Sequence, residues 1–492
     1  MIKAGFFEVD ISPSVMMSCT SFDEGSLGNI VSPPKLTASV WQSDALKIAI
    51  VGADICNIMR PVWEKARDIL REKFGFDGLV CNASHAHSAG PGIRDWVLPI
   101  SEVEKIEDIK PDLRRRIYSL RHPGDKREAV PPEINQLYLD LLPYRIVDAA
   151  VSAEKRLEEV RLINGKDIVR DVGHNRRQKM KQGCTFSHAG KGNPDIVGNA
   201  GPIDDEVTVL GAVNQCDQII GVLVNYGCHA TVAGSKEGFS GDWPYYLRET
   251  IRKMINPATV TVVLNGCCGD VTQVDNISLD PHRFSEQWCK ILGQRVAFPA
   301  IDVLTREPAH EFNVLKHASF DLQLNWREIS EEKYRKALDL VNREERGVPG
   351  CWFPMGVVLH YWKAKLYPHA KCNLNVVQIG NLVIATNPTE TFTQTGMDIK
   401  KGSPFPYTMT MGLTNDWLGY MATADAFGPQ GGGYEPQLKQ GTALEEDAAR
   451  KVTEKLLEMI RQLHPEKEIP APQVEKLAKT GRSFWHCPPE DM

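Results

Sequence analysis

Residues 78–92 read G-L-V-C-N-A-S-H-A-H-S-A-G-P-G, and this stretch indicates the fold class. Its apolar beginning is typical of the end of a buried strand, and a Gly-Pro-Gly breaker closes it. Upstream, residues 46–55 form another continuous apolar run, and residues 61–74 show helical spacing of Leu, Ile and Phe after an initial proline. Strand, helix and strand in this order make a β-α-β unit, so we predict an α/β protein with mixed β-sheets flanked by helices.

The rest of the chain alternates between apolar runs and helical patterns without an internal repeat or a clear linker. The predicted loops are residues 93–133 and 167–205. Strands are predicted at 207–213, 218–224, 260–264, 311–325 and 374–386, and helices at 134–160, 243–254 with Asp242 as the cap, 281–305, 330–346 and 441–462.

Composition narrows the class of protein. The 492 residues are 42% apolar and 24% charged, as in ordinary globular proteins, and the net charge is -6. Apart from the short basic stretch at residues 179–181, the sequence has no block rich in Lys and Arg. We therefore expect a small-molecule or amphiphilic substrate and no nucleic acid. No apolar run is long enough for a membrane helix, and the N-terminus has no secretory h-region. The twelve cysteines lack disulfide-scaffold spacing, so we expect a cytoplasmic protein with reduced thiols.

The two histidines of the opening stretch, His85 and His87, are candidates for a metal site. In extended backbone, side chains at positions i and i+2 point to the same side, and Ala86 between them is too small to obstruct them. Paired imidazoles of this kind suit a metal ion and its reacting water. The alternative interpretation is a solvated loop that happens to hold two histidines.

Further strand ends carry polar residues of the same kind: His229, Thr272 and Glu390. Because strand ends of one sheet can share an edge, residues far apart in the sequence can converge there. Two imidazoles and one carboxylate are the hydrolytic zinc set, with a coordination position left for water. Each of these residues alone would more simply be a hydrogen-bonded structural group.

Five sequence elements resemble the neutral/alkaline ceramidases, in the order of that family. They are S-H-A-H-S-A-G-P-G at 84–92, C-H-A-T at 228–231, G-D-V-T at 269–272, P-T-E-T at 388–391, and G-L-T-N-D-W-L-G-Y at 412–420 followed by G-G-G-Y-E at 431–435. The resemblance implies a neutral-ceramidase-like catalytic domain with its active site at strand ends. We assign residues 1–465 to this zinc hydrolase domain and residues 466–492 to a C-terminal tail.

The resemblance also implies roles for individual residues. His85, His229, Glu390 and Tyr420 would bind one Zn²⁺ ion. His87 and Tyr434 would lie beside the metal and stabilise the oxyanion that forms when zinc-bound water attacks an amide carbonyl. The alternative for Tyr420 is an aromatic side chain that packs under its loop. Gly431, Gly432 and Gly433 would leave Tyr434 free to move in on closure.

Three other positions have a resemblance-based role and a structural alternative. Thr272 would contact the polar end of the substrate, and it has no adjacent base that would make it a nucleophile. Arg176, in H-N-R-R, would lie near the site or in a solvated loop. Asp270 would orient a zinc histidine or close a turn.

Two further segments are rich in cysteine or aromatic residues. Cys267 and Cys268 are interpreted as small buried residues, not as reactive thiolates. The aromatic stretch at residues 351–367 would wall a pocket, act as a lid, or form the apolar stripe of a core helix.

The chain departs from the resembled family in its substrate-binding equipment. We find no counterpart of the family's C-terminal immunoglobulin-like domain, so we expect the zinc chemistry with a soluble or modestly amphiphilic substrate, ceramide remaining possible. The leading function is a zinc-dependent amidohydrolase acting on linear amides. The alternatives are a zinc esterase, lactonase or sugar-directed hydrolase, or a binding protein with a structural zinc. A homo-oligomer is possible.

Overall fold

The computed structural model describes residues 1–14, 17, 29–90, 98, 100–111, 114, 132–233, 238–279, 284–343, 352–438 and 442–467, apart from the side chains of 132–135 and 352. The Gly-Pro-Gly breaker beyond Gly90, most of the predicted 93–133 loop and the tail after residue 467 lie outside these residues.

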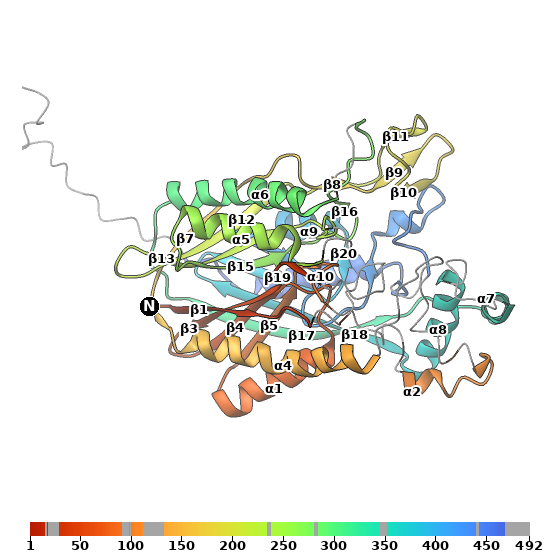
Figure 1. The fold of residues 1–492 in the computed structure, drawn as a ribbon, viewed down its shortest axis with the longest axis horizontal. Coiled ribbons are helices and arrows are strands. Elements are labelled where there is room, and N and C mark those ends of the chain that lie inside the picture. Colours follow the sequence, from red (N-terminus) through yellow and green to blue (C-terminus); the bar gives the residue numbers. More distant parts are fainter. Residues whose placement is uncertain are drawn as a thin grey trace, which may run out of the picture.

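Three sheets form the body of the molecule (Figure 1). Their strands, in spatial order, are as follows. The first sheet holds β5 (Gly78–Ala83), β4 (Lys47–Ala53), β3 (Lys35–Gln42), β1 (Lys3–Asp10) and β6 (Glu158–Glu159). The second holds β15 (Val260–Asn265), β13 (Ile219–Tyr226), β12 (Glu206–Val213) and β7 (Arg161–Ile168). The third holds β17 (Leu315–Asn325), β18 (His369–Ile379), β19 (Leu382–Thr386) and β21 (Tyr407–Met411).

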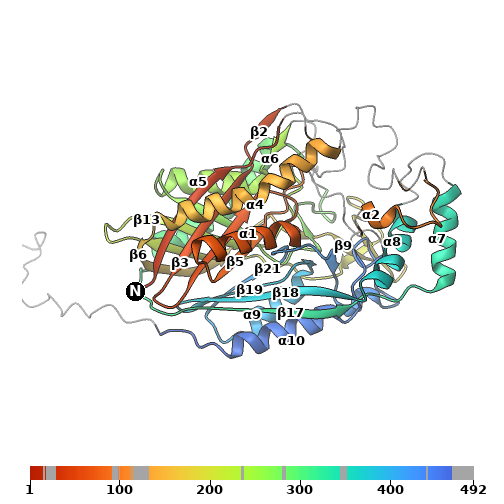
Figure 2. The same ribbon diagram turned by 90° about the horizontal axis from the view of Figure 1, so that it is seen from below.

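A pair of helices covers the outer face of each sheet. Helices α1 (Arg60–Phe74) and α4 (Pro132–Glu154) pack on the first sheet, and α5 (Asp242–Met254) and α6 (Glu286–Arg306) on the second. Helices α9 (Thr393–Gly402) and α10 (Ala448–Arg461) pack on the third, and Figure 2 shows α10 beneath β17, β18 and β19. A separate apolar cluster joins α2 (Ile100–Val103), α7 (Glu331–Arg343) and α8 (Trp352–Leu366).

The inner faces of the three sheets meet in a common core. Strand β4 shows how the sequence achieves this, because its side chains alternate between two apolar environments. Ile48 and Ile50 enter the central core with residues of all three sheets, whereas Ala49 and Val51 pack under α1 and α4. This double burial explains why residues 46–55 are continuously apolar.

Shorter elements surround the ends of the main strands. Strands β10 (Thr185–Ser187), β9 (Arg177–Met180) and β11 (Ile196–Asn199) form a small sheet, and three strand pairs join β14 (Phe239–Ser240) to β2 (Ile30–Ser32), β16 (Val271–Thr272) to β8 (His174–Asn175), and β20 (Glu390–Thr391) to β22 (Tyr420–Met421). A 3₁₀ helix spans Ala424–Phe427.

The predicted β-α-β unit is confirmed, since β4 and β5 pair in parallel around α1. Two other predictions are wrong. Residues 167–205 are not only loop but contain β8 to β11, and the single strand predicted at 374–386 is a hairpin of β18 and β19 that turns at Gly380, where φ is +61°. Both errors involve turns that hydrophobic periodicity does not record.

Helix boundaries also differ from the sequence expectations. The helix predicted at 134–160 ends at Glu154, and those predicted from residues 281 and 441 begin at Glu286 and Ala448. Asp242 was expected to cap α5 but has φ of +54° and is the first residue of the helix. Its carboxylate accepts hydrogen bonds from the backbone N–H groups of Val232 and Ala233, so it fixes the segment that follows His229.

Each sheet contains one parallel strand pair, and buried asparagines tie the carboxyl ends of these pairs together. Asn82, in β5, donates to the carbonyl oxygen of Gly412 at 2.7 Å and accepts from the N–H of Asn265 at 2.6 Å. Asn225, in β13, donates to the carbonyl oxygens of Leu264 and Thr410. The loops that leave these strands are therefore brought to one place.

Within the described residues, we find no helix with the length and apolar character needed to cross a membrane.

Candidate metal centre

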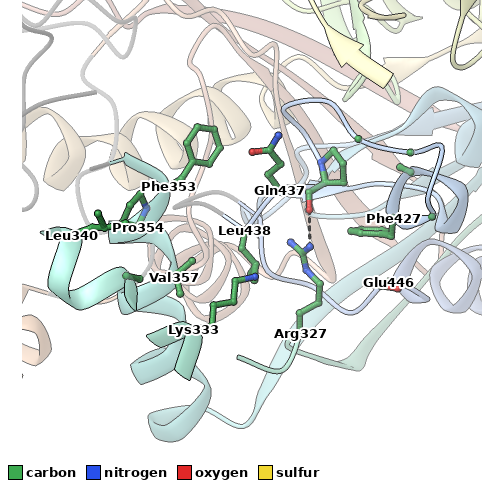
Figure 3. Close-up of a pocket in the computed structure, with 16 residues that line it drawn as sticks. Arg327, Lys333, Leu340, Phe353, Pro354, Val357, Phe427, Gln437, Leu438 and Glu446 are labelled. Carbon is green, nitrogen blue, oxygen red and sulfur yellow. Dashed lines mark hydrogen bonds between the residues drawn. The ribbon is translucent and has the colours of Figure 1, made fainter. Parts of the chain in front are cut away.

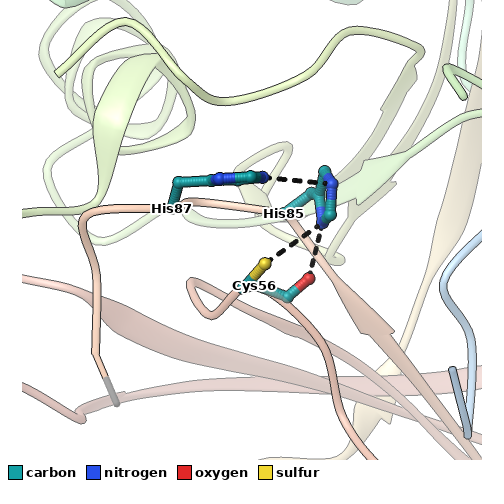
Figure 4. Close-up of side chains that lie close together, drawn as sticks. All are labelled: Cys56, His85 and His87. Atoms are coloured by element: carbon teal, nitrogen blue, oxygen red, sulfur yellow. Dashed lines mark hydrogen bonds between the residues drawn. The ribbon is translucent and has the colours of Figure 1, made fainter. Parts of the chain in front are cut away.

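His85 and His87 follow β5 and lie together, although not for the predicted reason. Strand β5 ends at Ala83, and His85 has a left-handed φ of +63°, so extended backbone does not align the two side chains. The turn nevertheless brings Nε2 of His87 within 3.3 Å of Nε2 of His85 (Figure 4). The backbone N–H of His85 is held by the carbonyl oxygen of Ile55 at 3.1 Å, which stabilises the turn.

Backbone carbonyl groups determine which nitrogen of each buried imidazole is protonated. Nδ1 of His85 lies 2.7 Å from the carbonyl oxygen of Cys56, and Nδ1 of His229 lies 2.8 Å from that of Cys268 and 2.9 Å from that of Val271. Because a carbonyl oxygen only accepts, Nδ1 carries the hydrogen in both rings. In the neutral form of each ring, Nε2 is therefore the atom that presents a lone pair.

The carboxylate of Glu390 lies close to both of these Nε2 atoms. Its Oε2 atom lies 3.2 Å from Nε2 of His85 and 3.4 Å from Nε2 of His229, while Oε1 accepts a hydrogen bond from Nε1 of Trp417 at 3.0 Å. Oε2 is buried and has no hydrogen-bond donor in this structure. The exposed fractions of His85, His229 and Glu390 are 2%, 1% and 4%.

This arrangement fits a cation. Ligand atoms of His85, His229 and Glu390 all lie within 4.8 Å of one another, and the imidazole orientation is the one in which Nδ1–H binds a carbonyl and Nε2 binds a metal. Cys56, His85 and His87 form a second compact group. There, however, the His85 nitrogen that faces Cys56 is Nδ1, which already donates to the Cys56 carbonyl, as Figure 4 shows.

The electrostatics favour an ionised carboxylate beside one neutral and one protonated imidazole. Burial alone would lower the pKa of His85, but Cys56 and Glu390 hold it well above its ordinary value. Burial, followed by the nearby Arg176 cation, lowers the pKa of His229 to about 4. Burial alone would raise the pKa of Glu390, but the imidazoles of His85 and His229 hold it well below its ordinary value. His229 and Glu390 thus have the protonation states that metal ligands need, and a bound cation would displace the Nε2 proton of His85.

Tyr420 lies opposite Glu390 because β22 pairs with β20 in parallel, with these two residues in register. Its hydroxyl oxygen accepts a hydrogen bond from Nη2 of Arg176 at 2.9 Å. Burial raises the pKa of Tyr420 well above its ordinary value, although Arg176 acts in the opposite direction. The structure thus places Tyr420 beside His85, His229 and Glu390, which we call the cluster. The role of Tyr420 as a metal ligand stays a prediction.

Arg176 is a buried residue of the cluster, and its other predicted interpretation, a solvated loop residue, does not fit. It lies between β8 and β9, with an exposed fraction of 7%. Its Nη1 lies 3.2 Å from Nε2 of His229, and Nη2 donates to the carbonyl oxygen of Gly269 at 2.9 Å. Nε donates to Oε1 of Glu435 at 2.6 Å, so a buried ion pair fixes the guanidinium.

Tyr434 also reaches the cluster. Its ring centroid lies 5.9 Å from that of Tyr420 in an edge-to-face arrangement. The loop before it is tied to β9 and β10, because Arg177 donates to the carbonyl oxygen of Gly432 and the backbone N–H of Tyr434 donates to the Ser187 hydroxyl at 2.8 Å. Gly432 and Gly433 adopt φ of +115° and +99°, which explains the need for glycine there.

Thr272 and Asp270 lie near the cluster without contacting its ligand atoms. The Thr272 hydroxyl donates to Oε1 of Gln273 at 2.9 Å. The Asp270 carboxylate accepts from the side chain of Asn175 at 2.8 Å and from the backbone N–H of Thr393 at 2.9 Å. Asp270 therefore fixes two loops and does not orient a histidine.

Cys267 and Cys268 are buried, as predicted. Burial raises the pKa of Cys267 to about 12 and that of Cys268 well above its ordinary value, so both are neutral thiols. Cys268 contacts the candidate site through its carbonyl oxygen, which lies 2.8 Å from Nδ1 of His229.

The aromatic stretch forms α8. Some of its aromatic side chains pack against α7, and one lies next to Tyr434. Tyr361 stacks on Tyr334 of α7 with ring centroids 4.0 Å apart, and Nε1 of Trp362 donates to the Tyr334 hydroxyl at 3.0 Å, which are packing contacts. Phe353, by contrast, lies edge-to-face against Tyr434 at 6.4 Å.

Sequence reasoning missed Trp417 and Glu435, which hold Glu390 and Arg176. Both lie inside the quoted motifs, Trp417 in G-L-T-N-D-W-L-G-Y and Glu435 in G-G-G-Y-E, so their positions were a usable signal. The carbonyl groups of Cys56, Cys268 and Val271 leave no signal in side-chain identity.

Comparisons with known proteins place this fold. The sequence matches no protein-family model, and it matches no curated protein. The structure is similar to that of neutral ceramidase from Pseudomonas aeruginosa, with a TM-score of 0.64 and 16% identity over 96% of this chain and 76% of that one. It is also similar to a ceramidase complexed with C2, with a TM-score of 0.64 and 15% identity over 96% of this chain and 78% of that one. The chain therefore has a neutral-ceramidase-like α/β fold, as the motifs predicted.

Proposed function

We propose that this protein is a zinc-dependent hydrolase that cleaves a linear amide into a carboxylate and an amine. The observation that carries the proposal is the meeting of Nε2 of His85, Nε2 of His229 and Oε2 of Glu390, with both Nδ1 atoms already bound to carbonyl groups. The ceramidase-like fold supports an amide as the substrate, and ceramide itself is one candidate.

The donor set supports zinc as the ion, with Tyr420 as the proposed fourth ligand. Two imidazoles and a carboxylate are characteristic of hydrolytic zinc sites, which keep an open position. When bound, zinc would supply Lewis acidity and make water nucleophilic near neutral pH.

The protein's own groups would bind and polarise the substrate. We assign the donors for the amide carbonyl oxygen to Nε2 of His87 and the Tyr434 hydroxyl, since fixed donors lower the barrier where negative charge develops. Arg176 would hold Tyr420 and add positive charge, and Thr272 would contact the polar end of the substrate. A metal centre with only a structural role would need no additional hydrogen-bond donor beside its ligands. His87, which lies 3.3 Å from His85, would be such a donor.

Metal content is the first test. We expect about one equivalent of zinc in the purified protein and loss of most of it in His229→Ala, because the variant keeps only part of the ligand set. His369→Ala, which changes an exposed histidine of β18, is the control and should retain the metal. Equal zinc content in both variants would remove the proposed site.

Turnover is the second test. A panel of N-acyl amides, matched esters and lactones should show amine release with wild-type protein and its loss after chelation, with recovery on adding zinc. His87→Ala should retain zinc and lose about a hundredfold in kcat, the usual effect of removing one oxyanion donor. Bound metal with no effect of His87→Ala on any substrate would favour a binding protein instead.

A further inference from the structure

A pocket of about 620 Å³ is lined in part by the loop that carries Tyr434 (Figure 3). Residues from 426 to 438 form one wall, and α7 and α8 form the other. Much of the lining is apolar, and Leu340 and Phe353 expose 52% and 36% of their surface. This size is typical of small-molecule sites, which lie in the range of about 300–1,000 Å³.

Arg327 gives the pocket a cation without a counter-ion. Its Nη1 donates to the carbonyl oxygen of Pro436 at 2.6 Å and Nη2 to that of Thr442 at 3.1 Å, while its buried Nε–H has no hydrogen-bond partner. No carboxylate of the described residues forms an ion pair with it. Burial lowers the pKa of Arg327 to about 10, although the charge of Glu446 opposes the shift. Such a group favours an anionic partner.

Lys333, on α7, is a second cation in the lining, and the ammonium group forms no ion pair within the described residues. Glu446 is the one carboxylate among the lining residues, and its charge acts on Arg327 without forming an ion pair with either cation within the described residues. Figure 3 shows Arg327 and Lys333 between Phe353 on one side and Phe427 on the other. The pocket therefore combines apolar walls with an excess of positive charge.

A row of aromatic rings connects this pocket to the candidate metal centre. Tyr434 lies against Tyr420 at 5.9 Å on the metal side and against Phe353 at 6.4 Å on the pocket side. Phe353 itself lines the pocket. The two sites are thus separated by one aromatic side chain of a glycine-containing loop.

We propose that this pocket binds the anionic end of an elongated amphiphilic amide whose scissile bond lies at the metal centre. The apolar walls would take the hydrocarbon part, and Arg327 and Lys333 would take a terminal carboxylate or phosphate. This substrate class rests on the proposed hydrolase function, but the binding of an anionic amphiphile to the pocket does not.

Binding is measured first, on full-length protein and on His229→Ala, so that it is independent of turnover. The calorimetric probes are octanoate, octyl phosphate and neutral octanamide. Both proteins should bind at least one anion about tenfold more tightly than the amide, because hydrogen bonds to a charged group are stronger than those between neutral groups. Whichever anion binds more tightly identifies the head group.

Variants locate the binding. Lys333→Glu should weaken anion binding about tenfold and leave octanamide unchanged. Lys336→Glu makes the same charge change on α7 outside the pocket, and should have no effect. Arg327→Met should act like Lys333→Glu, with thermal unfolding as the check on folding. Equal affinity for anions and octanamide, or equal effects of the two lysine variants, would overturn the proposal.

A kinetic measurement links the pocket to the metal centre. N-acetyl-8-aminooctanoate should be hydrolysed with a lower KM than its terminal carboxamide, and Lys333→Glu should abolish this difference. If neither compound is hydrolysed while the anions still bind, the hydrolase proposal fails and the anion pocket stands. If both are hydrolysed with the same KM, the assignment of the substrate's anionic end to the pocket is wrong.

Discussion

Trp417 donates its indole hydrogen to Oε1 of Glu390 at 3.0 Å, and this bond turns the other carboxylate oxygen toward His85 and His229. A ligand held in this way loses less rotational freedom when a metal binds. Supporting hydrogen bonds of this kind typically change metal affinity by about 10–100-fold. Trp417 would therefore act on a bound metal ion without contacting it.

The first prediction follows from this bond. Trp417→Phe keeps an aromatic ring in the core but removes the donor, so we expect zinc affinity to fall by about tenfold or more. Competition with a chromophoric chelator measures it. Trp41→Phe is the matched control, because it removes another buried indole hydrogen bond, to Ser39, away from the cluster. Equal affinities for the two variants would show that Glu390 needs no support.

The second prediction concerns Arg176, whose guanidinium contacts Glu435, Tyr420 and the Gly269 carbonyl at once. Lysine retains the charge but cannot make these bonds together. We expect Arg176→Lys to lower kcat about a hundredfold while zinc content stays at the wild-type level. Metal analysis and kinetics on one preparation test this. Parallel loss of zinc and activity would instead make Arg176 a support of the ligand set.

The sequence predicted the β-α-β unit because β4 and β5 are buried on both faces, which leaves long apolar runs. It missed β8 to β11, where polar residues such as Gln178 are buried and the strands are held by contacts made far along the chain. Thr185, for example, donates its backbone N–H to the carbonyl oxygen of Gly431. Periodicity within a segment cannot record such a contact.

The candidate site divides in the same way. His85, His229 and Glu390 could be selected because side-chain chemistry and motif order both indicated them. The left-handed turn at His85 could not, since it depends on the carbonyl oxygen of Ile55. Nor could the protonation of the imidazoles, which backbone carbonyl groups determine.

The third prediction concerns stability. Arg248 and Asp54 form a bidentate ion pair with exposed fractions of 3% and 1%, and Nη1 of Arg248 lies 3.0 Å from Oδ1 of Asp54. Arg248→Met leaves a buried carboxylate without its partner and should cost about 3–5 kcal/mol in urea unfolding. Arg450→Met breaks exposed pairs with Asp447 and Glu454, so it should leave the free energy of unfolding almost unchanged.

A double variant separates the lost pair from the stranded charge. Asp54→Asn combined with Arg248→Met removes both charges, so it should be more stable than Arg248→Met alone. A double variant that is less stable than the single one would mean that the Asp54 carboxylate is stabilised by other groups, of which the backbone N–H of Lys35 is one.

The fourth prediction is a pH dependence that arises at Asp242. Burial raises the pKa of this carboxyl group from 3.8 to about 6, although the N–H groups of Ala233 and Trp243 oppose the shift. Between these two values the folded protein keeps the proton and the unfolded chain has released it. Raising the pH through this window therefore destabilises the fold, and the contribution is lost above pH 6.

Asp242→Asn tests this sign because it cannot titrate. Relative to the variant, wild-type protein should lose stability between pH 4 and pH 6.5, by at most about 3 kcal/mol, since one pKa unit corresponds to about 1.4 kcal/mol. Thermal unfolding of both proteins at matched scan rates over this range measures the difference. Asp242 fixes Val232 and Ala233, just after His229. Ionisation of Asp242 should therefore also loosen the segment that carries His229. A difference that is constant with pH, or that grows in favour of wild type, would mean that Asp242 is ionised in the folded protein throughout.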